Sequence, residues 1–246
     1  METKETKGVN IFDLEEFQRR FTYYFGKYEL AFNERMIARF HLFADYLMCE
    51  NEKYNLTAIR DLDGVIVKHF IDSAVILNYA DLYLGADIID IGSGAGFPGI
   101  PLAICREDLN IACVDSANKK IEFIKSAARL LKLANLDALC GRAEDLELRE
   151  QYDFAVSRAV ARLNVLCELA APAIKIGGIF CAYKAKSADE ELRECENTFK
   201  ILGLELAGFS KFTLESEERA FILIKKTSAT PKEYPRNFSQ ISKNPL

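Results

Sequence analysis

The first third of the chain carries apolar residues at helical spacing. Two such series are evident: Ile11, Leu14, Phe17, Phe21 and Phe25, and then Met36, Ile37, Phe40, Phe43, Ala44 and Leu47. Positions three and four apart lie on one face of a helix, so each series predicts an amphipathic helix. A third helical segment is predicted over residues 62–79. We therefore predict an N-terminal helical region over residues 1–80.

After Gly85 the pattern changes to short apolar runs that alternate with helical stretches. The runs predict strands over residues 86–91, 111–115, 138–140, 154–156, 179–183, 204–212 and 220–225. The intervening helices are predicted over residues 100–105, 118–134, 160–174 and 188–202. Such alternation is typical of an α/β domain with a mostly parallel sheet. The last two strands have no helix between them, which predicts an antiparallel hairpin at one edge of this domain, over residues 81–226.

The tail, residues 227–246, contains Pro231, Pro235 and Pro245, so we expect it to be extended rather than helical. It is also basic. Between Lys225 and Leu246 the chain has five basic side chains and one acidic side chain, although the net charge of the whole chain is −5. The overall charge argues against nucleic-acid binding, but local patches decide such binding more than the total does.

Composition excludes several classes of protein. The chain has 246 residues, no apolar run long enough to span a membrane and a polar N-terminus without a signal-peptide pattern. None of its seven cysteines forms a C-x-x-C pair, and it has only two histidines. This argues against a disulfide framework and a metal site, and free thiols favour a cytoplasmic location.

A glycine-rich turn is the main candidate for chemistry. The sequence Asp90-Ile-Gly-Ser-Gly-Ala-Gly-Phe97 follows a predicted strand and opens a predicted helix. Glycines allow a tight turn and let a ligand approach the backbone. Gly94-Ala-Gly96-Phe-Pro-Gly99 matches G-x-G-x-x-G, but the first glycine after the strand is Gly92, and Phe97 stands where a dinucleotide site then needs glycine.

The turn therefore resembles that of class I S-adenosylmethionine-dependent methyltransferases, which are Rossmann-like and end in an antiparallel hairpin. The alternative is a turn that merely needs small residues. We expect the cofactor S-adenosylmethionine to contact Asp90, Gly92, Gly94, Gly96 and Phe97.

Three further loops follow predicted strands and so lie where ligands bind in open α/β sheets. Asp115 is placed to accept hydrogen bonds from ribose hydroxyls, or else to cap the next helix. Ala143 and Glu144 are expected beside the adenine, although a solvated acidic loop is the alternative. Arg158 is placed to meet the cofactor carboxylate or a phosphate of the substrate, or to lie in solvent at a helix start.

Several stretches resemble one family, bacterial ribosomal RNA small subunit methyltransferase G, also called glucose-inhibited division protein B. The matching stretches, from about residue 51 onward, are Asn55-Leu-Thr-Ala-Ile59, His69-Phe-Ile-Asp72-Ser73, Asp90 through Leu102, Asp115-Ser with Lys119-Lys120, Gly141-Arg-Ala-Glu144, Ser157-Arg-Ala159, Tyr234-Pro-Arg236 and Lys243-Asn-Pro245.

The resemblance, carried by those stretches, implies methylation of N7 of guanosine 527 in the 530 loop of 16S rRNA. It also implies cofactor contacts at Gly92, Phe97, Ala143, Glu144 and Arg158. One departure is Ala185 after Lys184, where the family pattern has glycine. The implied partner is 16S rRNA in the 30S subunit or in an assembly intermediate.

Guanine N7 has a free lone pair, so in-line methyl transfer needs no general base, and catalysis rests on positioning. We expect Arg158 and Lys184 to position substrate or cofactor, with Asn55 or Asp72 at the cleft. His69 and Asp72 share a helix face and act either at the site or as a structural pair. Basic residues expected to contact RNA, if not merely solvated, are Arg19, Arg20, Lys53, Arg60, Lys68, Arg158, Arg162, Lys184, Lys186 and the tail.

Two other functions remain compatible with the turn. One is a methyltransferase that acts on a protein or a small molecule, which should lack a contiguous basic surface. The other is a regulator that binds S-adenosylmethionine without transferring its methyl group.

Overall fold

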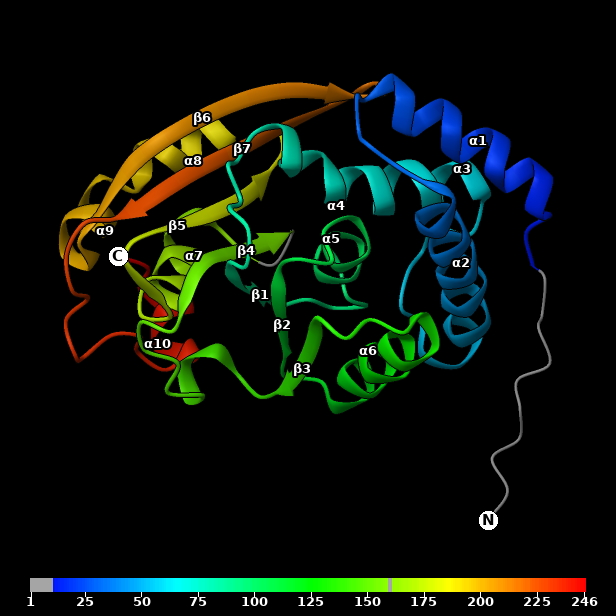
Figure 1. The fold of residues 1–246 in the computed structure, drawn as a ribbon. Coiled ribbons are helices and arrows are strands. Elements are labelled where there is room, and N and C mark those ends of the chain that lie inside the picture. Colours follow the sequence, from blue (N-terminus) through cyan, green and yellow to red (C-terminus); the bar gives the residue numbers. More distant parts are fainter. Residues whose placement is uncertain (1–10, 159–160) are drawn as a thin grey trace, which may run out of the picture.

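A seven-stranded sheet forms the centre of the computed structural model, which describes residues 11–158 and 161–246 (Figure 1). Its strand order is β3-β2-β1-β4-β5-β7-β6. The strands are β1 (Asp87–Ile91), β2 (Asn110–Asp115), β3 (Leu136–Cys140), β4 (Tyr152–Arg158), β5 (Ile174–Lys184), β6 (Leu204–Leu214) and β7 (Glu217–Lys226). The first five are parallel, and β7 pairs antiparallel with both β5 and β6. The predicted α/β class with a C-terminal hairpin is therefore confirmed.

Alternate side chains of the central strands enter two separate cores. In β1, Ile88 belongs to one apolar cluster, whereas Ile89 and Ile91 belong to the other. This is the arrangement expected of a sheet covered by helices on both faces. The helices on the first face are α5 (Gly99–Cys105) and α6 (Asn118–Leu131), and those on the second are α7 (Leu163–Ala170), α8 (Ala188–Glu194), α9 (Glu196–Leu202) and α10 (Phe238–Lys243).

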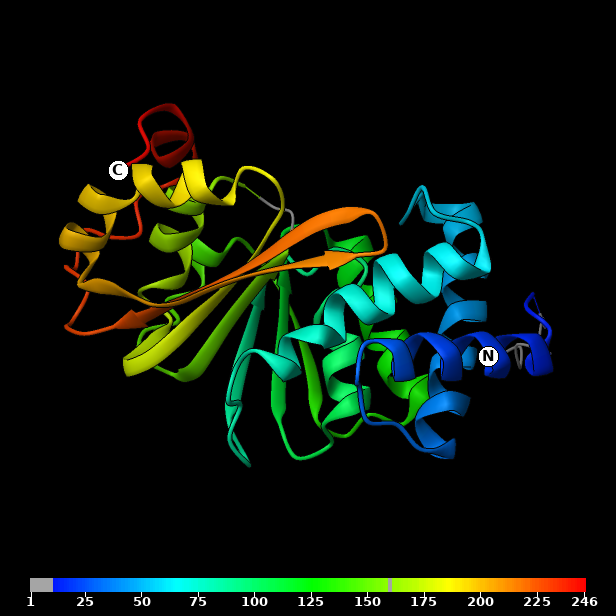
Figure 2. The ribbon, with the colours of Figure 1, turned by 90° about the horizontal axis from the view of Figure 1, so that it is seen from above.

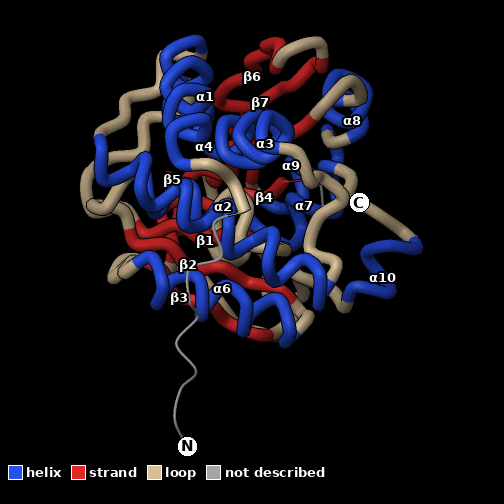
Figure 3. The backbone as a smooth tube through the Cα atoms, turned by 90° about the vertical axis from the view of Figure 1, so that its right-hand side faces the viewer, coloured by secondary structure: helices blue, strands red, loops and turns tan. Residues whose placement is uncertain are grey.

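The N-terminal helices share the first of these cores. They are α1 (Leu14–Lys27), α2 (Glu34–Tyr54), and a continuous helical segment made of α3 (Leu62–Gly64), the π-helix η1 (Val65–Ile71), α4 (Asp72–Ala74) and the 3₁₀-helix η2 (Val75–Asn78). Figure 3 shows them in front of the strands. Their fully buried aromatic side chains include Phe21, Phe40 and Phe43, and Phe43 packs 5.5 Å from Phe97 of the glycine turn. The helical region thus packs directly against the turn.

The hairpin of β6 and β7 also reaches the N-terminal helices (Figure 2). Glu215 at its tip accepts from Lys27 of α1 at 2.7 Å, and Glu217 accepts from Lys68 of η1 at 2.8 Å. The rings of Tyr79 and Phe212 lie 5.2 Å apart. The last strands and the first helices, which are far apart in sequence, are therefore in direct contact.

Some predicted boundaries are wrong for local reasons. The helix predicted to reach residue 174 ends at Ala170, because Pro172 interrupts it and β5 begins at Ile174. Residue 160, its predicted start, lies outside the described residues. The helix predicted over residues 188–202 is divided into α8 and α9 at Cys195.

The prolines predict an extended tail, but the tail contains the short helix α10. Asn237 caps this helix by accepting a hydrogen bond from the Gln240 backbone, a local arrangement that the prolines of the tail do not prevent. Figure 1 shows α10 beside α7.

The close approach of α5 to the sheet predicts a steric cost at Gly99. A Cβ atom there would collide with Sγ of Cys113 and lie 3.0 Å from Oδ2 of Asp90. We expect Gly99→Ala to lower the free energy of unfolding by roughly 1–3 kcal/mol, the usual range for overpacking. Urea unfolding would measure it. Gly26→Ala in α1 is the control, because a Cβ there meets no atom within 4 Å, and helix propensity makes that change neutral or stabilising. Equal stabilities of the two variants would contradict the prediction.

Candidate functional site

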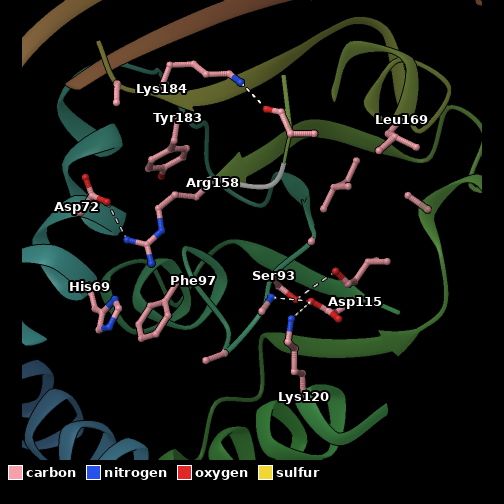
Figure 4. A pocket seen from close by; sticks show the side chains of 18 of the residues that line it. His69, Asp72, Ser93, Phe97, Asp115, Lys120, Arg158, Leu169, Tyr183 and Lys184 are labelled. Atoms are coloured by element: carbon pink, nitrogen blue, oxygen red, sulfur yellow. Dashed lines mark hydrogen bonds and ion pairs between the residues drawn. The ribbon is translucent and has the colours of Figure 1, made fainter. Parts of the chain in front are cut away.

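A cavity of about 900 Å³ lies at the carboxyl ends of β1 and β4 (Figure 4). This is where the strand order reverses direction, the usual ligand position in such sheets. One side of the cavity is formed by loops of the sheet domain, and the other by η1, α4 and the β6–β7 hairpin. The N-terminal region is therefore part of the site.

The glycine turn adopts a conformation that requires its glycines. Gly92, Gly94 and Gly96 have φ angles of 73°, 59° and 84°, a region that other residues rarely occupy. Gly92 and Gly94 line the cavity, and a Cβ atom on Gly94 would meet no protein atom within 4 Å. Gly96 does not line it, because its Cβ position is occupied by Ile100 of α5. Gly94 therefore leaves room for a ligand, whereas Gly96 leaves room for a helix.

Asp90 supports the turn and does not line the cavity. Its side chain is fully buried, and Oδ2 accepts a hydrogen bond of 2.9 Å from the Gly99 backbone. Oδ1 has no hydrogen-bond partner among the described residues. Burial raises the pKa of Asp90 to about 7, against the opposing effect of the Gly99 hydrogen bond. In this structure the role of Asp90 is to join the turn to the start of α5.

Asp115 reaches from the end of β2 into the cavity. Its Oδ2 accepts from the Gly94 backbone at 3.0 Å and lies 3.3 Å from Nζ of Lys120, while Oδ1 accepts from the Ala117 backbone at 2.9 Å. Ala117, not Asp115, is the N-cap of α6. The carboxylate is thus oriented beside the glycine turn, and its contact with a ribose stays a prediction.

The loop after β3 contributes the neighbouring part of the wall. Ala143 and Glu144 begin the 3₁₀-helix η3 (Ala143–Asp145), and both line the cavity. The Glu144 side chain is almost fully buried and lies 3.8 Å from the Arg142 guanidinium. Both residues therefore line the cavity, and their contact with an adenine stays a prediction.

Arg158 and Asp72 meet on the opposite side of the cavity, as Figure 4 shows. Nη1 of Arg158 donates to Oδ2 of Asp72 at 2.8 Å and to the Lys68 carbonyl at 2.9 Å. Asp72 also accepts from Nε of Arg219 at 3.0 Å. Arg219 and Lys68 both pair with Glu217. This group, the Asp72 cluster, has three cationic side chains against two carboxylates, and hence one positive charge in excess.

His69 and Phe97 stack beside this cluster, with ring centres 4.5 Å apart and planes inclined by 11°. The Arg158 guanidinium lies 5.1 Å from the centre of the Phe97 ring. Burial, and next the charge of Arg158, lower the pKa of His69 to about 3, so the imidazole is neutral at physiological pH.

The segment Asn55–Ile59 is held near the cavity by α2. The buried Asn51 side chain donates to the Thr57 carbonyl and accepts from the Thr57 backbone, each at 2.9 Å. Oγ1 of Thr57 lies 2.8 Å from Nε2 of His69. Leu56 and Ile59 line the cavity, whereas the exposed Asn55 does not. Asn55 ends α2 with a φ of 51°.

Lys184 lines the cavity, but its ammonium group is already hydrogen-bonded within the protein. Nζ donates to the Ala161 carbonyl and to Oε2 of Glu191, both at 2.7 Å. Ala185, where the family pattern has glycine, does not have a positive φ. The backbone at this position therefore does not require glycine.

Several lining residues were not identified from the sequence, among them Ser93, Lys120, Tyr183, Phe212, Arg219, Phe221 and Phe238. Most come from elements distant in sequence from the glycine turn. The sequence signal for Phe238 would have been an aromatic residue three positions before the apolar Ile241 in an otherwise polar stretch of the tail. Within residues 11–158 and 161–246, no group of three or more His, Cys, Asp or Glu side chains could hold a metal ion. No helix in the described part of the chain is long and apolar enough to cross a membrane.

The strand order, the C-terminal hairpin and a glycine turn facing a cavity define a class I S-adenosylmethionine-dependent methyltransferase. Solved structures of similar fold include YcgJ from Bacillus subtilis (TM-score 0.52, 14% identity, 65% of this chain and 100% of that one). Another is an S-adenosylmethionine-dependent methyltransferase from Aquifex aeolicus (TM-score 0.52, 15% identity, 65% and 93%).

The family model for rRNA small subunit methyltransferase G matches residues 36–221, and the chain belongs to this family. The relative named ribosomal RNA small subunit methyltransferase G from Clostridium beijerinckii (strain ATCC 51743 / NCIMB 8052) is 42% identical, covering 85% of this chain and 91% of its own. That from Desulfitobacterium hafniense (strain Y51) is 43% identical, covering 85% and 89%. The chain is accordingly an enzyme that uses S-adenosylmethionine.

The open space beside Gly94 predicts that a side chain there would weaken cofactor binding, in addition to lowering the stability of the protein. Gly94→Ala and Gly85→Ala both place a Cβ at positive φ, 59° and 77°, with no atom within 4 Å. Each should lower stability by roughly 1–2 kcal/mol, the cost of left-handed backbone. Only Gly94→Ala should also weaken S-adenosylmethionine binding, by at least about tenfold, because its methyl group enters the cavity. Calorimetric Kd values would test this, and equal affinities of the two variants would refute it.

The raised pKa of Asp90 predicts a pH dependence of stability. Between pH 4 and 7 the folded protein binds a proton at Asp90 that the unfolded chain has lost, since the folded pKa is about 7 and the unfolded one about 4. Over this range Asp90 ionises more readily in the unfolded chain than in the folded protein, so raising the pH favours unfolding. The stability of the wild type relative to Asp90→Asn should therefore fall as pH rises from 4 to 7, by up to about 1.4 kcal/mol per pH unit. Urea unfolding of the cofactor-free proteins measures it. A difference that does not vary with pH would show that Asp90 is ionised.

Proposed function

We propose that the protein methylates N7 of a guanosine in 16S rRNA, at position 527 in the 530 loop, and that it acts on the 30S subunit or an assembly intermediate. The observation that carries the proposal is the extent of the family match, residues 36–221. This range includes both sides of the cavity, with the glycine turn, the Asp72 cluster and the His69–Phe97 stack.

The residues of one side of the cavity fit S-adenosylmethionine. The backbone at Gly92 and Gly94 can approach a ligand closely, and the carboxylate of Asp115 can accept hydrogen bonds from two ribose hydroxyls. The next loop along the sheet, at Ala143 and Glu144, is then in position for the adenine. This order leaves the methyl end of the cofactor toward Phe97 and Arg158. When bound, the cofactor supplies an electrophilic methyl group on its sulfonium.

The residues on the other side fit a reaction without proton abstraction. Guanine N7 carries a lone pair, so the protein has to orient the base and exclude water rather than remove a proton. His69, with its pKa near 3, is not a cation that would repel the purine as it becomes positively charged. Asp72, held by Arg158 and Arg219, forms part of the wall that would orient the base. Lys184, paired with Glu191, shapes the wall beside them.

The excess positive charge of the Asp72 cluster is suited to an RNA phosphate. Lys68 is half exposed beside Glu217, and surface pairs of this kind are weak enough to exchange for a phosphate. Other basic residues expected to contact RNA also pair with carboxylates, among them Arg20, Arg60 and Arg162. Affinity for free RNA should consequently be low and sensitive to salt, which favours a folded, partly assembled substrate.

One assay tests the proposal against its alternatives. The protein is incubated with labelled S-adenosylmethionine and unmodified 30S subunits, and modified nucleosides are mapped. The proposal expects 7-methylguanosine at one site of 16S rRNA and little label in a minimal hairpin. Label in protein or small molecules would support another methyltransferase, and cofactor binding without any transfer would support a regulator.

Arg158→Ala should reduce the rate of this reaction by roughly 100-fold, because it removes the contacts with Asp72 and the Lys68 carbonyl that orient the cavity wall. Single-turnover rates on 30S subunits measure the effect. Arg129→Ala is the control, since Arg129 is exposed on α6 and outside the cavity. Full activity of Arg158→Ala, with normal binding of cofactor and RNA, would contradict this assignment.

A further inference from the structure

The C-terminal segment, residues 234–246, is anchored firmly to the sheet domain. Glu168 of α7 is completely buried and accepts three hydrogen bonds from Arg236: from the backbone N–H at 2.9 Å, from Nε at 2.8 Å and from Nη2 at 2.6 Å. A buried carboxylate without such a partner would be strongly destabilising. At the other end, the Leu246 carbonyl accepts from Oγ1 of Thr198 at 2.8 Å. Both ends of the segment are thus held in place.

These anchors change the role expected of the basic tail. Arg236 is directed inward and neutralised by Glu168, and Lys226 is buried and donates to the carbonyls of Ala171 and Ile174. Two of the basic side chains after residue 224 therefore serve the fold and are not available to RNA.

Between the anchors, α10 carries one aromatic side chain into the cofactor cavity. Ile241 of α10 is fully buried in the second core, which fixes the orientation of this short helix. Phe238, three positions earlier, lines the cavity. The segment therefore contributes a wall to a site otherwise built from residues before 222.

Phe238 also contacts the loop after β3. The Arg142 guanidinium lies 5.6 Å from the centre of the Phe238 ring, a cation–π distance. Arg142 directly precedes Ala143 and Glu144, and all three line the cavity. Ala143 and Phe238 pack against the same apolar cluster. The aromatic ring and this loop thus form one continuous surface.

We propose that Phe238 completes the adenine end of the cofactor site, as an apolar wall against the adenine ring and as a support for the Arg142–Glu144 loop. The inference rests on the orientation of the cofactor given under the proposed function, with the ribose at Asp115 and the adenine at the next loop. Phe238 is then a cofactor-binding residue contributed by the C-terminal segment, which Arg236 anchors to Glu168.

Phe238→Ala tests the proposal. The Kd for S-adenosylmethionine, measured by calorimetry without RNA, should rise roughly tenfold, the order of effect known for removing one aromatic contact with a base. The same factor is expected for 5′-methylthioadenosine, which keeps the adenine and lacks the amino-acid portion. Phe238→Leu should recover part of the affinity, and Ser239→Ala, exposed on the same helix and outside the cavity, should leave it unchanged.

Two outcomes would overturn the inference. One is a folded Phe238→Ala protein that binds both ligands within twofold of the wild type. The other is an effect seen with S-adenosylmethionine but not with 5′-methylthioadenosine, which would place Phe238 at the amino-acid end. If Phe238→Ala does not fold, Arg142→Ala is measured in its place, because the Arg142 side chain is more than half exposed. An unchanged Kd for Arg142→Ala would contradict the proposal that Phe238 supports the loop through Arg142.

These measurements are independent of the RNA substrate. If the wild type binds S-adenosylmethionine but forms no 7-methylguanosine, the proposed function fails and the test of Phe238 still stands. If the wild type forms 7-methylguanosine while Phe238→Ala binds both ligands normally, only the inference fails.

Discussion

The close packing of the turn between β1 and α5 is the constraint on which the rest of the site depends. Asp90 accepts a hydrogen bond from the Gly99 backbone, and Gly99 has no Cβ, so the start of α5 lies directly against Cys113 of β2. With the helix held there, the backbone from Gly92 to Gly94 turns sharply, with positive φ at both glycines, and both glycines line the cavity. The buried carboxylate therefore acts on the cofactor site only through the backbone that it holds.

The same turn is supported from outside the sheet domain. Phe97 packs on Phe43 of α2 and stacks on His69 of η1. His69 is in turn linked to α2 through Thr57 and Asn51. A π-helical segment at this place is typical of a functional site, since its wider turn alters which side chains and carbonyls face inward. The N-terminal helices thus contribute one wall of the cavity, and they share an apolar core with the part of the sheet domain that forms the opposite wall.

Several charged side chains around the cavity are arranged in ion pairs. The Asp72 cluster joins η1, α4, β4 and β7, and its excess of one positive charge lies beside the half-exposed Lys68. Arg236, in the C-terminal segment, is neutralised by the buried Glu168. A chain with a net charge of −5 can therefore still carry a local excess of positive charge, as the proposed contact with an RNA phosphate requires.

The order of elements, the glycine turn and the cavity positions of Asp115, Ala143, Glu144 and Arg158 are predictable from the sequence alone, because these residues follow strands whose ends meet at one edge of the sheet. Local pattern is sufficient for such residues. The folded structure is needed to see that Asp90 lies behind the turn, that Asn55 lies outside the cavity and that Arg219 and Phe238 line it. The positions of Arg219 and Phe238 depend on contacts between segments far apart in sequence, namely the hairpin against η1 and α4 and the tail against α7. Those of Asp90 and Asn55 depend on hydrogen bonds of the Asp90 and Asn51 side chains, which no hydrophobic periodicity encodes.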